Sequence, residues 1–305
     1  MNYVKLKTKP IDFSGKRTKI TKQQITRELM WIHKNYAFSV FSYCGRRGEG
    51  TSKKLVEKTG TGNCIGLSYG LQARLKKKYG VESYVIPATV PDYINKPEYL
   101  DISHVALMIP GSKNSVFYIA DPAFYFVEPI KVDLKKWKFP GSFVMSDIYN
   151  ESSGDNRERC ESSVHFLESD YELNNYQTIG KNTVVVSCLK GMESWKYFVT
   201  QIVNPDAAIT KFFMEVWKNK PFITRTKVEK NQVINKISIH HRTNSTITIK
   251  ERNSIIYEGS VEDLTKKQLR YLDAKLSITN FRGPKFEKFL LKPQKAGNLG
   301  CIFTI

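Results

Sequence analysis

Residues 60–80 read GTGNCIGLSYGLQARLKKKYG, and this stretch predicts a helix that begins at a cysteine. Leucines follow at helical spacing, at Leu67, Leu71 and Leu75. Three lysines at 76–78 and then Gly80 are typical of a helix end, because cations and glycine are favoured there. Cys64 therefore takes the first helical position, where unpaired N–H groups and the helix dipole favour a thiolate over a thiol.

The elements on either side of this helix predict an α+β protein. Upstream, Thr21-Lys22-Gln23-Gln24 has capping-box spacing ahead of a helix, and a second short helix is expected over 52–57. Downstream, short β-type runs typical of an antiparallel barrel or a curled sheet follow at 82–87, 104–109, 116–121, 124–127, 183–189 and 197–203. The polar stretch 141–180 is interpreted as a surface insertion in this β region.

A last unit begins at Asn204-Pro205, a good helix start. It predicts a helix to about Lys218, three strands (222–229, 233–241 and 246–257) and a final helix over 265–275. We therefore expect a helical domain over 1–80, a β domain over 81–203 and a mixed unit over 204–305.

Composition limits the classes of partner and compartment. Lysine and arginine exceed aspartate and glutamate by 48 to 29, a net charge of +19, which attracts anions of many kinds. The basic residues are scattered and form no nucleic-acid-binding motif, so we expect no dedicated nucleic-acid partner. No apolar run reaches membrane-spanning length, so we expect no membrane partner. Five widely spaced cysteines without a secretion signal favour reduced thiols, a cytoplasmic location and no metal site.

The segment 104–121 places a histidine and an aspartate at the two ends of a predicted hairpin. His104 begins one apolar run and Asp121 ends the next, with turn residues Gly111-Ser112-Lys113-Asn114 between them. A symmetric hairpin pairs 110 with 115 and therefore His104 with Asp121, with Cβ atoms about 5 Å apart. We expect the carboxylate to hold the imidazole through Nδ1, which leaves Nε2 facing a nucleophile.

Cys64, His104 and Asp121 together fill the three roles of a thiol-based catalytic site. Taken singly, each residue has an ordinary structural explanation: free cysteines are often buried, strand histidines are often core residues, and aspartate before proline often ends a strand. Their predicted convergence favours catalysis. A thiol on a helix, with histidine and aspartate on adjacent strands, is the layout of transglutaminase-like and related cysteine enzymes.

With these three residues in place, the chain resembles the arylamine N-acetyltransferases. The segment 33–40 is similar to the family's early His…Pro-Phe-Glu-Asn segment, and Gly62-Asn63-Cys64 is similar to its Arg-Gly-Gly-x-Cys motif. Ser103-His104-Val105-Ala106-Leu107 resembles the Thr-His-x-x-Leu strand, and Asp121-Pro122-Ala123-Phe124 stands where the family has Asp-Val-Gly-Phe. The tail Phe303-Thr304-Ile305 is similar to that of eukaryotic members.

The chain departs from the family pattern at several motif positions. Gly60 replaces the motif arginine, Thr61 its first glycine, and Gly66 the acid or amide two past the cysteine. Ala37-Phe38-Ser39-Val40 replaces Pro-Phe-Glu-Asn. Asp101 lies in the turn that in the family receives the cofactor pyrophosphate, where a second negative charge is unfavourable. These departures leave open whether the donor or the acceptor has changed.

The resemblance implies a cysteine-protease-like core made of a helical bundle, an antiparallel β-barrel and an α/β lid. It also implies acetyl transfer from acetyl-CoA to a small aromatic amine or hydrazine, through an acetyl group on Cys64 and release of coenzyme A. Phe38, Phe124 and the tail near Ile302 are the expected walls for a flat acceptor. No metal is implied.

Two alternatives remain open from the sequence. A transglutaminase-like cysteine hydrolase or peptidase would use the same triad on amide bonds. A catalytically inactive, basic binding protein would keep the triad as a relic and bind anions through its positive charge.

Overall fold

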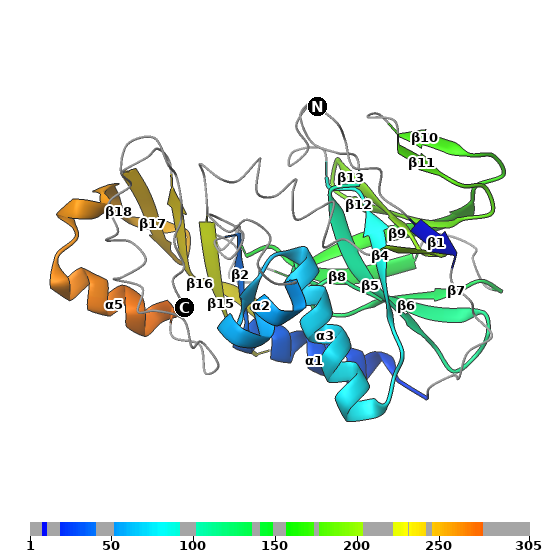
Figure 1. Ribbon diagram of the computed structural model, residues 1–305, viewed down its shortest axis with the longest axis horizontal. Coiled ribbons are helices and arrows are strands. Elements are labelled where there is room, and N and C mark those ends of the chain that lie inside the picture. The colour runs from blue at the N-terminus through cyan, green and yellow to red at the C-terminus, as the bar shows by residue number, and fades with distance from the viewer. Residues whose placement is uncertain are drawn as a thin grey trace.

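The computed structural model describes residues 8–10, 19–40, 52–91, 102–135, 141–148, 157–173, 177–203, 222–230, 232–241 and 246–276. Along the long axis of the molecule, a β-barrel lies at one end and a smaller sheet with one helix lies at the other (Figure 1). The N-terminal helices lie between them, beneath the barrel in this view. The predicted helix over 205–218 lies outside the described residues.

The described residues of the N-terminal part form three helices: α1 (Lys22–Asn35), α2 (Ser52–Thr59) and α3 (Cys64–Tyr79). The capping box of α1 is present, because the Thr21 side chain accepts the Gln24 N–H and the Gln24 side chain accepts the Thr21 N–H. Helix α3 has the predicted bounds and ends at Gly80, whose φ of 65° is a left-handed cap. The short strands β2 (Ala37–Ser39) and β3 (Thr61–Gly62) pair in parallel, directly before α3.

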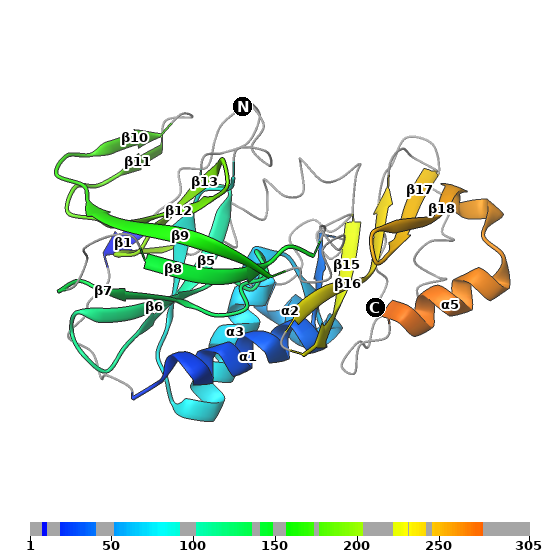
Figure 2. The ribbon, with the colours of Figure 1, turned by 180° about the vertical axis from the view of Figure 1, so that it is seen from behind.

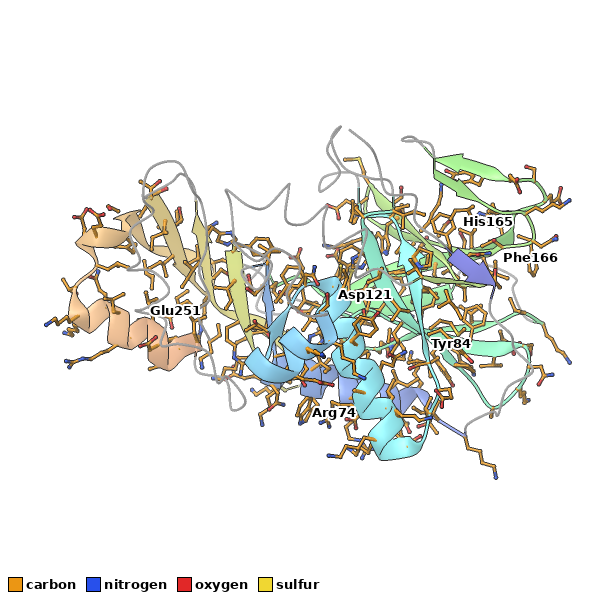
Figure 3. All side chains as sticks on the ribbon, viewed as in Figure 1. Arg74, Tyr84, Asp121, His165, Phe166 and Glu251 are labelled. Carbon is orange, nitrogen blue, oxygen red and sulfur yellow. The ribbon has the colours of Figure 1, made fainter. Side chains whose placement is uncertain are left out.

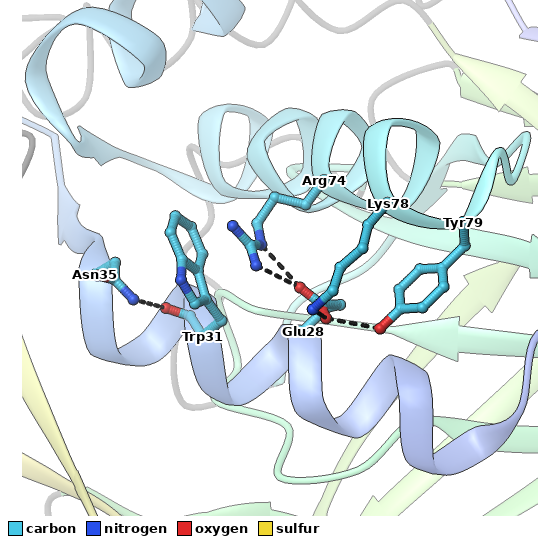
Figure 4. A network of polar contacts seen from close by, with 6 residues as sticks. All are labelled: Glu28, Trp31, Asn35, Arg74, Lys78 and Tyr79. Carbon is cyan, nitrogen blue, oxygen red and sulfur yellow. Dashed lines mark hydrogen bonds and ion pairs between the residues drawn. The ribbon is translucent and has the colours of Figure 1, made fainter.

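A buried carboxylate joins α1 to α3 (Figure 4). Glu28 on α1 accepts two bonds from Arg74, at 2.9 and 2.6 Å, one from Lys78 at 2.7 Å and one from the Tyr79 hydroxyl at 2.9 Å. The Arg74 guanidinium also lies over the Trp31 ring, 3.3 Å from its centroid. This network fixes the helix that begins at Cys64 against its neighbour.

Eight antiparallel strands form the barrel sheet, in the order β7-β6-β5-β4-β13-β12-β9-β8. Their bounds are β4 (Tyr84–Ala88), β5 (His104–Pro110), β6 (Val116–Ala120), β7 (Ile130–Asp133), β8 (Gly141–Ser146), β9 (Arg157–Phe166), β12 (Val184–Lys190) and β13 (Glu193–Phe198). Strands β5 and β6 are buried along nearly their whole length, since α3 packs against β5 and α1 contacts β6. Because both strands are buried on both faces, each appears in the sequence as a continuous apolar run.

The segment just before β7 nearly closes the barrel onto β8. Val127 donates its N–H to the carbonyl of Val144, and Ser146 donates its N–H to the carbonyl of Tyr125, both at 3.0 Å. Residues 124–127 were expected as a strand, but they form a turn with a single bridge, Phe126 to Met145. Figure 2 shows this side of the barrel, with β6 to β9 facing the viewer.

The segment 141–180 was expected as a surface insertion, but two of its described stretches, 141–146 and 157–166, are strands of the barrel sheet. It supplies β8 and β9, and β9 pairs with β12 from Val184↔Phe166 to Leu189↔Glu161. The polar composition of this segment suggested a loop, but β9 is rich in polar residues because its outer face is largely exposed. Two smaller antiparallel pairs stand outside the barrel sheet: β10 (Tyr171–Leu173) with β11 (Gln177–Ile179), and β1 (Thr8–Pro10) with β14 (Gln201–Val203).

In its described residues, the C-terminal unit is a sheet of four antiparallel strands with one helix packed on it. The strands are β15 (Phe222–Glu229), β16 (Gln232–His241), β17 (Thr246–Glu251) and β18 (Ser254–Ser260), followed by the 3-10 turn η3 (Val261–Asp263) and α5 (Lys266–Leu276). Three strands were expected, but the third run divides at Arg252 and Asn253, both with positive φ. Strand β15 also pairs with β2, so this sheet continues to β3 beside Cys64. The predicted α+β architecture is confirmed.

Candidate active site

Cys64 lies at the first residue of α3 and is 2% exposed. Asn63, directly before it, caps the helix, because its Oδ1 accepts the N–H of Ile65 at 3.1 Å and of Gly66 at 3.3 Å. The thiol thus stands where the N–H groups of a helix terminus point outward and favour negative charge.

His104 and Asp121 are in direct contact at the junction of helices and barrel, where Figure 3 labels Asp121. His104 Nε2 and Asp121 Oδ2 are 2.6 Å apart, and both side chains are buried. Cys64 lies close enough to His104 that its interaction with the imidazole raises the pKa of the ring. The structure therefore brings together the three residues that the sequence singled out.

Two details of the predicted hairpin were wrong. Strands β5 and β6 pair Leu107 with Ala120, a register two residues away from the expected one. A shift of two keeps every side chain on its face, so His104 and Asp121 still meet as diagonal neighbours. The imidazole is also turned: Nε2 contacts the carboxylate, and Nδ1 is the ring nitrogen left for the sulfur.

The electrostatics favour a charged imidazole. Burial lowers the pKa of His104, but the Asp121 carboxylate, its hydrogen bond and Cys64 together raise this pKa to about 10. Asp121 Oδ1 accepts the N–H groups of Ala123 at 3.0 Å and Phe124 at 3.1 Å, which fixes the carboxylate against the imidazole. Near pH 7 the site is therefore arranged to hold a cationic ring between sulfur and carboxylate.

The expected wall residues have different surroundings. Phe124 stacks on the His104 ring with centroids 4.0 Å apart and meets the edge of Trp195. Phe38 on β2 pairs with Gly62, two residues before Cys64, and stacks on Phe222 of β15 at 5.4 Å. Ile302, the third expected wall residue, lies outside the described residues.

Tyr197 on β13 belongs to the site and was not predicted. Its hydroxyl donates to Asp121 Oδ2 at 2.7 Å, the oxygen that also contacts His104. Burial, and then the Asp121 carboxylate, raise the pKa of Tyr197 well above its usual value, so the phenol remains a donor. The contact joins residues 76 positions apart, and no local sequence pattern could have indicated it.

One of the motif departures has a backbone explanation. Gly60 has a φ of 66°, a conformation that side chains disfavour, at the end of α2. The retained glycine Gly62 packs closely on Gly66, because an added Cβ on Gly62 would come within 3.1 Å of the Gly66 Cα. Thr61 is buried in β3. Asp101 lies outside the described residues.

The described part of the chain holds three buried free thiols, those of Cys64, Cys160 and Cys188. Among the same residues, no cluster of histidine, cysteine and acidic side chains could hold a metal ion. Nor is any of the described helices long and apolar enough to cross a membrane.

Comparisons with known proteins identify the fold. No protein-family model and no curated protein sequence matches the chain. An arylamine N-acetyltransferase from Bacillus cereus, described as having a unique Cys-His-Glu catalytic triad, is 13% identical with a TM-score of 0.51 over 87% of this chain and 94% of that one. The enzyme from Mycobacterium abscessus is also 13% identical, with a TM-score of 0.51 over 86% and 84% of the two chains. At these identities the likeness concerns the fold, and the chain has the arylamine N-acetyltransferase fold with its cysteine-protease-like core.

Proposed function

We propose that this chain, which has the arylamine N-acetyltransferase fold, is an acyltransferase that carries an acetyl group on Cys64. The donor would be acetyl-CoA and the acceptor a small aromatic amine or hydrazine. The observation that carries the proposal is the buried contact of His104 Nε2 with Asp121 Oδ2 at 2.6 Å, beside a thiol at a helix N-terminus. A raised His104 pKa supports the thiolate–imidazolium pair that such a nucleophile needs.

In the first half-reaction, the Cys64 sulfur attacks the thioester carbonyl and forms a new carbon–sulfur bond. The Cys64 N–H, at the first helical position, is the proposed donor to the developing oxyanion. Collapse of this intermediate breaks the bond to the coenzyme A sulfur, and the His104 imidazolium supplies the proton to the leaving thiolate. Asp121 keeps its charge throughout and stabilises the imidazolium.

In the second half-reaction, the amine nitrogen attacks the acetyl carbonyl on Cys64. Neutral His104 takes the proton from nitrogen, the carbon–sulfur bond breaks, and the Cys64 thiolate returns to its pairing with the imidazolium. We propose Phe124, whose ring lies on His104, and Phe38, on the strand beside Gly62, as apolar walls for the aromatic acceptor.

The proposed chemistry needs a reduced thiol. The described cysteines are free, which is consistent with a reducing compartment such as the cytoplasm. The net charge of +19 would attract a phosphate-bearing donor, although it would attract other anions equally.

Intact-mass analysis after incubation with acetyl-CoA tests the proposal. We expect a gain of one acetyl group in the natural chain and in Cys188→Ala, a control that removes a buried thiol of the barrel, but no gain in Cys64→Ala. Addition of an aromatic amine should discharge the adduct.

Other outcomes would point to the alternative functions. Release of amines from amide substrates without coenzyme A would favour a transglutaminase-like hydrolase that uses the same three residues. Absence of any Cys64 reactivity, with salt-sensitive binding to nucleic acid that Cys64→Ala leaves unchanged, would favour a basic binding protein.

A further inference from the structure

A second histidine, His33, lies on the last turn of α1 and contacts the backbone of Phe126, five residues after Asp121. It is 2% exposed, and its Nε2 is 2.9 Å from the carbonyl oxygen of Phe126. Burial lowers the pKa of His33 to about 4, although the Phe126 carbonyl and Asp121 act in the opposite direction. The ring is therefore neutral near pH 7, and it donates the Nε2 proton because a carbonyl can only accept.

The bond from His33 ends on a turn that carries two groups of the site. This turn, residues 121–126, begins with Asp121, whose carbonyl accepts the Phe126 N–H at 3.1 Å. Within it, Tyr125 has a φ of 53°. The left-handed conformation is unfavourable for a residue with a bulky side chain and persists only where the surroundings hold it in place.

His33 contacts the turn at its strained end. Its ring lies against the Tyr125 ring, with centroids 5.7 Å apart, and its proton goes to the next residue, Phe126. Phe126 is also the residue that bridges to Met145 and helps to close the barrel. The helix thus supports the turn from outside the barrel sheet.

The backbone of His33 is itself held by the C-terminal unit. Its carbonyl accepts the Thr226 hydroxyl at 2.6 Å and an Arg225 Nη1–H at 3.4 Å, both from β15. Arg225 also donates to the carbonyls of Lys34 at 2.6 Å and Tyr36 at 3.3 Å, at the end of α1. These bonds leave His33 little freedom to move away from the turn.

We propose that His33 is a positioning residue, whose bond to the Phe126 carbonyl holds the 121–126 turn so that the Asp121 carboxylate and the Phe124 ring stay against the His104 imidazole. A hydrogen bond at 2.6 Å tolerates little displacement, so a relaxed turn weakens the Asp121–His104 contact first. The inference rests on the proposed roles of Asp121 and His104, and it is independent of the acyl donor.

Two amide variants distinguish a role of His33 in holding the turn by a hydrogen bond from a role in merely filling space. In His33→Gln the amide reaches the place of Nε2 and can still donate to Phe126. In His33→Asn the amide ends near the place of Nδ1 and falls short. The readouts are iodoacetamide alkylation of Cys64 at pH 7 and the NMR titration of His104, whose signal is identified by its loss in His104→Ala. Circular dichroism verifies folding.

We expect His33→Gln to alkylate within about twofold of the natural chain and His33→Asn to alkylate about fivefold to tenfold more slowly, since one hydrogen bond contributes about 1 kcal/mol. The His104 titration should move to lower pH in His33→Asn only. Equal behaviour of the two folded variants, whether both fast or both slow, would overturn the proposal. If His33→Asn does not fold, His33→Phe, which fills the space of the ring without a donor for the Phe126 carbonyl, replaces it, and an alkylation rate equal to that of His33→Gln would overturn the proposal.

Neither readout requires acetyl-CoA, so the two proposals can fail separately. A natural chain whose Cys64 reacts no faster than its other cysteines would refute the triad, and the positioning role with it. Fast alkylation in the natural chain, together with matching Gln and Asn variants, would refute the positioning role alone.

Discussion

Replacing Glu28 with glutamine removes the charge at the centre of the α1–α3 contact while keeping the shape of the side chain. The carboxylate is fully buried and accepts four bonds, from Arg74, Lys78 and Tyr79 (Figure 4). Burial raises the pKa of Glu28, but the bonds from Lys78, Arg74 and Tyr79 together lower it below its usual value. The charged form is therefore favoured in the folded state.

The magnitude follows from the exposure of the partners. Breaking a buried ion pair typically costs about 3–5 kcal/mol of unfolding free energy, because a charge is left without a partner. Here Arg74 is 23% exposed and Lys78 is 46% exposed, so water can solvate both cations. The glutamine oxygen can also keep one of the bonds. We therefore expect Glu28→Gln to lower the free energy of unfolding by about 2–3 kcal/mol, below the range for a fully buried pair.

Urea unfolding followed by circular dichroism at pH 7 measures this loss. Glu82→Gln is the matched control, because Glu82 pairs with Lys76 and both side chains are more than half exposed. Exposed pairs contribute about 0–1 kcal/mol, so the control should change little. Since the pKa of Glu28 is lowered, its contribution is present above about pH 4.5 and lost as the pH falls further. Equal losses in the two variants, or a Glu28→Gln loss that persists undiminished into strong acid, would refute the reasoning.

Three further predictions concern the surroundings of the site. Gly62→Ala should lower the free energy of unfolding by about 1–3 kcal/mol and slow Cys64 alkylation, because the added Cβ meets the backbone of α3 at 3.1 Å. Gly180→Ala is the control: it has open space around it and should leave both the free energy of unfolding and the alkylation rate unchanged. Tyr197→Phe should lower the free energy of unfolding by about 1.5–3 kcal/mol in urea titrations, since the Asp121 carboxylate loses a donor, and a loss below about 0.5 kcal/mol would contradict this. Because the pKa of His33 falls from 6.5 to about 4 on folding, stability should decline as the pH falls from about 6.5 to 4, by up to roughly 3 kcal/mol, and His33→Gln should flatten that slope.

Local patterns in the sequence were sufficient to predict the helix that carries the nucleophile. The bounds of α3, its cationic last turn and its glycine cap followed from residues 64–80 alone, because helix caps are short-range features. The approach of His104 to Asp121 was also predicted. Its register was wrong by two, since Gly111 pairs with Val116 and the loop therefore starts one residue later than assumed. An even error keeps the faces, which is why the pairing of the two side chains was still right.

Contacts across the fold could not be predicted in the same way. Tyr197 and His33 reach the site from elements 76 and 93 positions away from their partners. The orientation of the imidazole likewise depends on where the carboxylate stands in three dimensions. For β9, polar residues on the outer face of a barrel strand could not be distinguished from a loop by composition alone.

The position of β2 between β15 and β3 has a consequence for biosynthesis. During translation, β2 and β3 emerge early, but the strand that completes their edge is made only when residues 222–229 appear. Until then β2 has a free edge where β15 will pair. The segment β2–β3 ahead of Cys64 is therefore not yet held in its final position. We expect Cys64 to become reactive only after most of the polypeptide has been synthesised. The thiol of a nascent chain would then be protected from premature reaction.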